Sequence, residues 1–74
     1  MAEIENVTDA VKLTDRQLQT LYLASQGNTN SQIAEVLGLA VSTVANTLRT
    51  VYRKIGVSNR VLAVRWFLEK CGEA

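Results

Sequence analysis

The sequence contains no histidine, no proline, one cysteine (Cys71) and only four glycines among its 74 residues. Without histidine and with a single thiol, the chain can form neither a His/Cys zinc site, nor a Cys–His catalytic pair, nor an internal disulfide. No carboxylate pair and no glycine-rich phosphate loop occurs at a useful spacing, so we expect no enzyme activity, no metal and no cofactor. The absence of proline and the few isolated glycines favour several helices with short connections.

Long apolar runs are also missing. No run approaches the ~18 residues of a membrane span, and the N-terminus is acidic rather than basic and then apolar, as a signal peptide would be. We therefore expect a cytoplasmic protein without membrane contact. The chain is 47% hydrophobic and 20% charged, which is typical of a globular domain. We expect this domain over residues 13–72, after a flexible arm or linker remnant over 1–12. That arm is too short for a sensor domain, so no small-molecule ligand is expected within this chain.

The charges are distributed unevenly. Residues 1–37 hold two basic and five acidic side chains, a net charge of −3, and residues 38–74 hold six and two, a net charge of +4. Five basic residues and no acid lie between Arg49 and Arg65. Such segregation indicates a basic face for an anion such as the DNA backbone, although a solvated surface is the simpler alternative.

Helix starts and ends can be read from capping residues. Two capping boxes, Thr14 with Gln17 and Thr29 with Gln32, predict two helix starts. Glycines at 27, 38, 56 and 72 predict the helix ends. The third helix should cover about 41–55, with Ala40 as an oxygen-free cap that Ser42 or Thr43 partly replaces. The fourth should cover about 59–70, with Ser58 as its N-cap. On the first helix, we expect Leu18, Leu21, Tyr22 and Ser25 along one side, with Leu23 and Ala24 broadening the apolar surface.

The stretch from Asn30 to Arg49 has the pattern of a helix-turn-helix. A small residue (Ala34), a turn glycine (Gly38) and a buried β-branched residue (Val44) allow two helices to cross steeply through a short turn. In such a motif the second helix enters the DNA major groove. An ordinary αα-hairpin in a small bundle is the alternative.

The fourth predicted helix is apolar nearly all round. A single buried stripe needs fewer apolar residues, so the surplus should face a partner, and a second copy is the simplest one. We expect a homodimer interface at Val61, Val64, Arg65 and Leu68. The alternative is a monomer in which Trp66 and Phe67 complete the small core.

From Leu13 to about Leu68, the chain resembles the LuxR/FixJ-type (GerE-type) helix-turn-helix domain of bacterial regulators. The matching residues are Leu13, Thr14, Arg16, Gly27, Gln32, Ile33, Ala34, Leu37, Thr43, Val44, the run from Val51 to Val57, Asn59 and Arg60. The resemblance implies an all-α, four-helix fold, insertion of the third helix into the major groove, and dimerisation through the fourth. Family members usually have an acid at Gln17, a capping Ser or Thr at Ala40, a Lys at Ala45 and a His at Thr47.

The face of the third helix opposite Val44 and Leu48 should contact DNA. We expect Ala45, Asn46 and Arg49 to read bases, because asparagine can pair with adenine, arginine with guanine, and alanine can pack on a thymine methyl. Backbone contacts are expected from Ser42, Thr43, Thr50, Arg53, Lys54 and Arg60. Alternatively, Asn46 is a plain solvated residue, and Lys54 or Arg60 pairs with an acid and pins the fourth helix to the third.

The predicted function is that of a sequence-specific transcription regulator that binds double-stranded DNA. The alternative is a helix-turn-helix-derived module that pairs with another regulator and modulates it. A net charge of only +1 mildly favours this alternative.

Overall fold

The structure, a computed structural model, describes residues 12–72, all of whose regular elements are helical. They are α2 (Asp15–Ser25), α3 (Asn30–Leu37), α4 (Val41–Ile55), α5 (Arg60–Phe67) and a terminal π-helical turn, η1 (Leu68–Gly72). The predicted all-α, four-helix fold is confirmed. The arm predicted over 1–12 lies outside the described residues except for Lys12.

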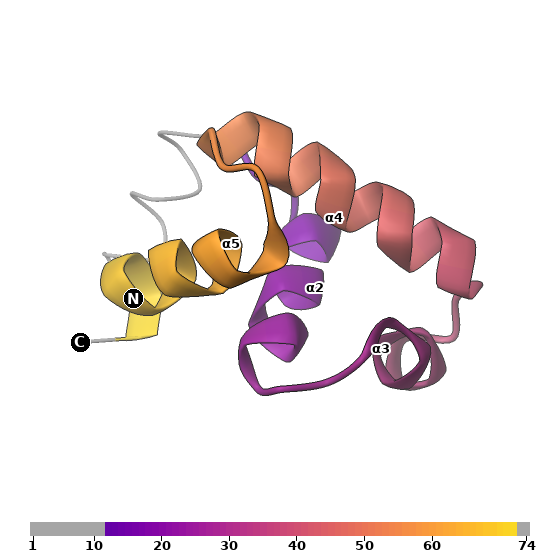
Figure 1. The fold of residues 1–74 in the computed structure, drawn as a ribbon. Helices are drawn as coiled ribbons and strands as arrows, with labels where there is room; N and C mark the ends of the chain where they lie inside the picture. The colour runs from indigo at the N-terminus through magenta and orange to yellow at the C-terminus, as the bar shows by residue number, and fades with distance from the viewer. Residues whose placement is uncertain (1–11, 73–74) are drawn as a thin grey trace.

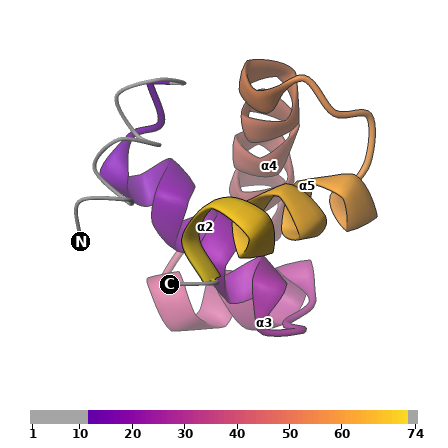
Figure 2. The ribbon, with the colours of Figure 1, turned by 90° about the vertical axis from the view of Figure 1, so that its left-hand side faces the viewer.

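Helix α2 occupies the centre and contacts α3, α4 and α5 (Figure 1). Helices α3 and α4 form a corner through the turn at Gly38, and α5 returns from the end of α4 to pack against α2. The turned view shows α4 upright with α5 lying across it (Figure 2). One long side of α4 is thereby left on the outside of the molecule.

The core consists of two clusters of buried apolar side chains. The first joins α4 and α5 to the α2 region through Leu13, Leu21, Val51, Ala63 and Phe67. The second joins α2, α3 and α4 through Ala24, Ile33, Ala34, Val44 and Leu48. Helix α4 contributes to both, and Tyr52 packs against both from the side. The position of α4 is therefore fixed from two directions.

Both predicted capping boxes are present. The Gln17 N–H donates to Thr14 Oγ1 (3.1 Å) and the Thr14 N–H to Gln17 Oε1 (2.9 Å). The same reciprocal pair joins Thr29 and Gln32 at 3.2 and 2.8 Å. These bonds satisfy N–H groups that have no partner within a helix, so they define where α2 and α3 begin.

The helix-turn-helix corner is also confirmed. Gly38 has φ +69° and ψ +37°, the left-handed conformation that glycine adopts without steric cost. The Leu39 N–H then donates to the Ala34 carbonyl (2.9 Å), which closes the turn. Ala34 and Val44 are 5% and 0% exposed, so the small residue and the β-branched residue fill the inner angle as predicted.

The start of α5 differs from the prediction. Asn59, not Ser58, is the N-cap, because its Oδ1 accepts from the Leu62 N–H at 3.0 Å. Asparagine caps at least as well as serine, so residue type does not decide between Ser58 and Asn59, and the local path of the backbone does. The α-helical part then ends at Phe67 rather than near Lys70, and the chain continues to Gly72 as a π-helical turn.

The inward face of α2 was also assigned imperfectly. Tyr22 is 50% exposed, whereas Thr20, which is polar, is completely buried. Thr20 can be buried because its hydroxyl donates to the Arg16 carbonyl one turn earlier (2.7 Å). The stripe is therefore centred on Leu21 and Ala24 and leaves the tyrosine at the edge, against Phe67.

Candidate nucleic-acid interface

The outer face of α4 carries most of the predicted DNA-contacting residues. Val44, Leu48 and Val51 point into the core and are at most 2% exposed. The other side of the same helix presents fully or partly exposed side chains, namely Ser42, Thr43, Ala45, Asn46, Arg49, Thr50 and Arg53. A straight helix with one buried face must present the opposite set together. The predicted residues on α4 therefore form one continuous surface, called the α4 face below.

The first turn of α4 has no side-chain cap. Ala40 lies at the N-cap position with extended backbone and makes no side-chain hydrogen bond. Neither Ser42 nor Thr43 replaces it, so the predicted compensation was wrong; the Thr43 carbonyl instead accepts from the Thr47 hydroxyl at 2.8 Å. Uncapped N–H groups at the positive end of a helix favour an anion nearby.

Two polar side chains on the α4 face bind each other. Arg49 Nη1 donates to Asn46 Oδ1 at 2.7 Å, between two exposed residues one helical turn apart. The Thr50 hydroxyl is turned inwards to the Asn46 carbonyl (3.1 Å). Sequence spacing predicted that Asn46 and Arg49 are neighbours, but not that they pair.

Lys54 reaches the start of α2. Its Nζ donates to the Lys12 carbonyl (2.8 Å) and to Gln17 Oε1 (3.0 Å). The side chain nevertheless remains exposed. It thus joins the end of α4 to the α2 capping box, and because both acceptors are neutral, its positive charge is not cancelled by them.

Arg60 connects α5 to the region where α3 begins. Its Nη1 donates to Asn30 Oδ1 (2.8 Å) and its Nη2 to the Asn28 carbonyl, so it ties the first residue of α5 to the first residue of α3 and to the loop before it. The side chain is partly buried. The alternative, that Lys54 or Arg60 pairs with an acid and pins the fourth helix to the third, is not observed: Lys54 connects α4 to α2 and Arg60 connects α5 to the start of α3, both through amide and carbonyl oxygens. Sequence reasoning missed Asn28 and Asn30, which are 32 and 30 residues away from Arg60.

Restoring the acid that related domains carry at Gln17 should affect stability and DNA binding in opposite directions. Gln17→Glu keeps the capping oxygen, adds a negative charge at the start of α2 and gives Lys54 an ion-pair partner. We therefore expect the free energy of unfolding, measured by thermal unfolding, to increase by about 0.3–1 kcal/mol. The added negative charge should weaken DNA binding. It should also reduce the steepness of the log–log dependence of DNA affinity on salt concentration by at most about 1.

The control for Gln17→Glu is Gln19→Glu. It adds the same charge two residues along α2, where the side chain is exposed and lies on another face. Equal effects of the two substitutions on DNA affinity would mean that net charge, rather than Lys54, is responsible.

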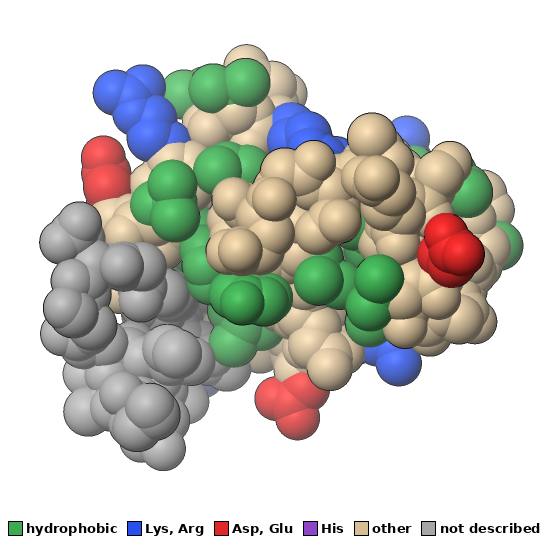
Figure 3. Space-filling model, turned by 90° about the horizontal axis from the view of Figure 1, so that it is seen from below, with side chains coloured by type: hydrophobic (Ala, Val, Ile, Leu, Met, Phe, Trp, Pro, Cys, Tyr) green, Lys and Arg blue, Asp and Glu red, His purple; other side chains and the backbone are tan. Residues whose placement is uncertain are grey.

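The described part of the chain is more basic than the whole. Residues 12–72 contain eight basic and three acidic side chains, a net charge of +5, against +1 for the full sequence. Seen from below Figure 1, with α4 on the far side, the surface shows apolar side chains across its middle and basic groups mainly towards its edges (Figure 3).

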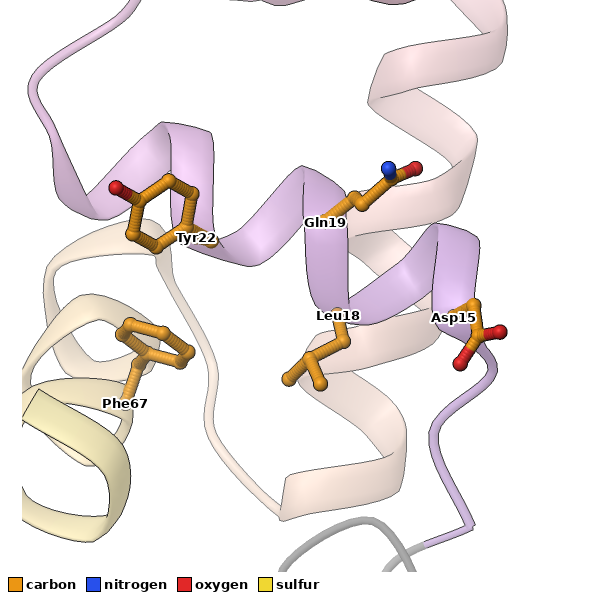
Figure 4. A pocket seen from close by; sticks show the side chains of 5 residues that line it. All are labelled: Asp15, Leu18, Gln19, Tyr22 and Phe67. Atoms are coloured by element: carbon orange, nitrogen blue, oxygen red, sulfur yellow. The ribbon is translucent and has the colours of Figure 1, made fainter. Parts of the chain in front are cut away.

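Two open hollows lie away from the α4 face. One, of about 420 Å³, is lined by Leu18, Tyr22, Phe67, Asp15 and Gln19 between α2 and α5. In Figure 4 the Tyr22 and Phe67 rings stand beside each other at its edge, edge to face with centroids 6.1 Å apart. The other is polar and lies at the start of α3, beside Arg60. Neither includes a residue of α4.

The predicted dimer residues on α5 and η1 differ in exposure. Val61 is 72% and Leu68 45% exposed, and Arg65 is exposed as well. Val64 is only partly exposed and packs against the second core cluster of its own chain. An apolar surface therefore remains at Val61 and Leu68, with Val64 contributing more to the fold than the prediction assumed.

Among residues 12–72, no helix is both long and apolar enough to cross a bilayer. Within that same range, no three residues of the His, Cys, Asp or Glu types lie close enough together to bind a metal ion.

The sequence matches known proteins over most of its length. The family described as bacterial regulatory proteins, luxR family, matches residues 11–67. The nitrate/nitrite response regulator protein NarP of Escherichia coli is 42% identical over 60 residues, 81% of this chain and 28% of NarP. The response regulator RamR of Streptomyces coelicolor is 49% identical over 53 residues, 72% of this chain and 26% of RamR.

A third relative comes from another kind of regulator. The transcriptional activator protein EsaR of Pantoea stewartii is 39% identical over 61 residues, 82% of this chain and 24% of EsaR. The chain thus spans about a quarter of the length of these relatives. No solved structure matches it. These relatives are named as regulators and none as an enzyme, and a match over most of the folded helices leaves one assignment: the chain belongs to the luxR family of bacterial regulatory proteins.

Proposed function

We propose that this chain is the DNA-binding part of a transcription regulator and that it binds double-stranded DNA in a sequence-dependent manner. The observation that carries the proposal is the α4 face, on which Asn46, Arg49 and Arg53 are exposed together on a helix fixed from behind by two core clusters. Membership of the luxR family supports it. A bacterial protein that acts on DNA works in the cytoplasm, and we include this localisation in the proposal.

Helix α4 has suitable dimensions for the major groove. Its 15 residues span about 22 Å at 1.5 Å per residue, which exceeds the ~12 Å width of the groove. The N-terminal half would enter with Ala45, Asn46 and Arg49 towards base edges. The uncapped first turn, Ser42, Thr43 and Arg53 would approach the flanking phosphates.

Salt dependence tests the proposal most directly. Binding to duplex DNA, measured by fluorescence anisotropy between 50 and 200 mM salt, should weaken with a log–log slope of about −0.9 for each phosphate neutralised. With roughly four such contacts, the affinity falls on the order of a hundredfold over this range. Selection from a random DNA pool should then yield one preferred half-site.

The alternative, a module that pairs with another regulator, is favoured by one observation, the exposed apolar side chains Val61 and Leu68. It predicts no binding to any duplex even at low salt. The five basic residues, with no acid, between Arg49 and Arg65 argue against it.

We further propose that two copies pair through Val61, Leu68 and Arg65, with Val64 behind them. Val61→Glu and Leu68→Glu should each shift sedimentation at high protein concentration from dimer towards monomer, because an exposed apolar contact is replaced by a repelling charge. The fold should survive, since both side chains are exposed in the single chain.

The matched control for the dimer is Val36→Glu, the same exchange at a valine that is 63% exposed on α3. It should leave sedimentation unchanged. An unmutated chain that stays monomeric at high concentration would end the dimer proposal.

A further inference from the structure

We propose that Asn46 is a positioning residue for Arg49 rather than an independent reader of adenine, and that the pair presents one guanidinium edge to a guanine. This inference rests on the proposed DNA-binding function and deepens it. It replaces the expectation that both side chains read separate bases.

The geometry of the pair carries the inference. Asn46 Oδ1 accepts from Arg49 Nη1 at 2.7 Å, a short distance for a charge-assisted bond. The guanidinium is planar and has five N–H donors in fixed directions. A bond at Nη1 leaves the Nε–Nη2 edge free with two parallel donors. Two parallel donors are what the O6 and N7 acceptors of guanine require.

The same bond couples any adenine reading by Asn46 to the position of Arg49. Bidentate pairing with adenine needs the amide oxygen to accept from N6 and the amide nitrogen to donate to N7. In the structure, one of the two lone pairs of that oxygen is already used by Arg49. An adenine held through the second lone pair would have to lie directly beside the guanidinium, so Asn46 cannot read a base independently of Arg49.

The surroundings make the orientation of Arg49 matter. Arginine has a long side chain, so fixing it on binding costs conformational entropy unless it is already held. The neighbouring position, where related domains usually carry a lysine, is Ala45, which brings no second cation to the same turn. Arg49 is thus the cation available at this level of the α4 face, and Asn46 is the side chain that directs it.

The test compares two substitutions of Asn46 that separate the two roles. Asn46→Asp keeps an oxygen acceptor for Arg49 but loses the N–H₂ donor that adenine reading needs. Asn46→Ala loses both. All proteins are titrated against the site selected by the unmutated chain and against its single base-pair variants. The readout is selectivity, the ratio of affinities for two base pairs at one position, in which the uniform effect of the added charge cancels.

We expect Arg49→Ala to identify one base pair at which guanine preference is lost, a preference of about 5- to 150-fold in the unmutated chain. At that base pair, Asn46→Ala should reduce the preference by about three- to tenfold, and Asn46→Asp should retain it. In the Arg49→Ala background, Asn46→Ala should have no further effect on selectivity, because positioning residues are not additive with the residue they position.

Three results would overturn the inference while leaving the proposed function intact. They are an unchanged guanine preference in Asn46→Ala, a loss in Asn46→Asp as large as in Asn46→Ala, or a loss at a different, A·T base pair. If the unmutated chain binds no duplex at low salt, the proposed function and this inference both fail.

A measurement without DNA adds an independent readout. The ¹⁵N relaxation of the Arg49 side chain should report a restricted Nε–H in the unmutated chain and in Asn46→Asp, and a mobile one in Asn46→Ala. Equal mobility in all three would contradict the positioning role. Circular dichroism should show the same helix content for each variant, because Asn46 is exposed and outside the core.

Discussion

Replacing Arg49 by alanine should weaken binding to the selected DNA site by about 1–3 kcal/mol and abolish the preference at one base pair. Arg49 is exposed on the face of α4 opposite Leu48 and Val51, so its removal leaves the core unchanged. The loss should therefore appear in competition binding but not in thermal unfolding. Anisotropy titrations with the selected site and with each single base-pair variant measure both parts of the effect.

Arg53→Ala is the matched control. Arg53 is also an exposed arginine on α4, one turn further along. As a phosphate contact, it should weaken binding to every sequence about equally and reduce the salt slope by about 1. If Arg49→Ala behaved in this uniform way too, base reading by Arg49 would have to be abandoned.

Arg60→Ala should lower stability by about 1–3 kcal/mol, because a partly buried guanidinium loses hydrogen bonds to Asn30 and to the Asn28 carbonyl. For a domain of this size, each kcal/mol corresponds to a change in melting temperature of about 4–8 °C. Calorimetry or circular dichroism measures the shift. The sequence alone assigned Arg60 to the DNA backbone, a role that predicts little change in stability.

Arg60→Lys separates the two roles of Arg60. Lysine keeps the charge but not the planar fork that reaches two acceptors. If Arg60 has a structural role, Arg60→Lys should also be less stable than the unmutated chain. If Arg60 contacts a phosphate instead, Arg60→Lys should have nearly the same stability and DNA affinity as the unmutated chain. Arg53→Ala, at an exposed arginine of α4, should leave the melting temperature nearly unchanged.

The scaffold of this domain was predictable because its determinants are local. Each capping box joins residues three apart, and the corner depends on Ala34, Gly38 and Val44 within one short stretch. Helical spacing was also enough to assign the α4 face, since Val44, Leu48 and Val51 define its opposite side.

The connections between helices were less predictable. Lys54 and Arg60 find partners 30 to 42 residues away, and nothing in their spacing indicates those partners. The assignment of the α5 cap failed for a different reason, because Ser58 and Asn59 are both good caps and only the chain path selects one. Tyr22 was expected beside Leu21 but is half exposed, whereas Thr20 is buried because its hydroxyl bonds within its own helix.

The division of the core into two clusters has a consequence for how such a domain changes its DNA preference. Helix α4 is supported on one side of its length by Val44 and Leu48 and further along by Val51, each in a different cluster. A change of side-chain volume in one cluster alone would tilt the helix about the other. In the DNA complex proposed above, the angle of α4 in the major groove would then change through substitutions inside the protein that never touch DNA.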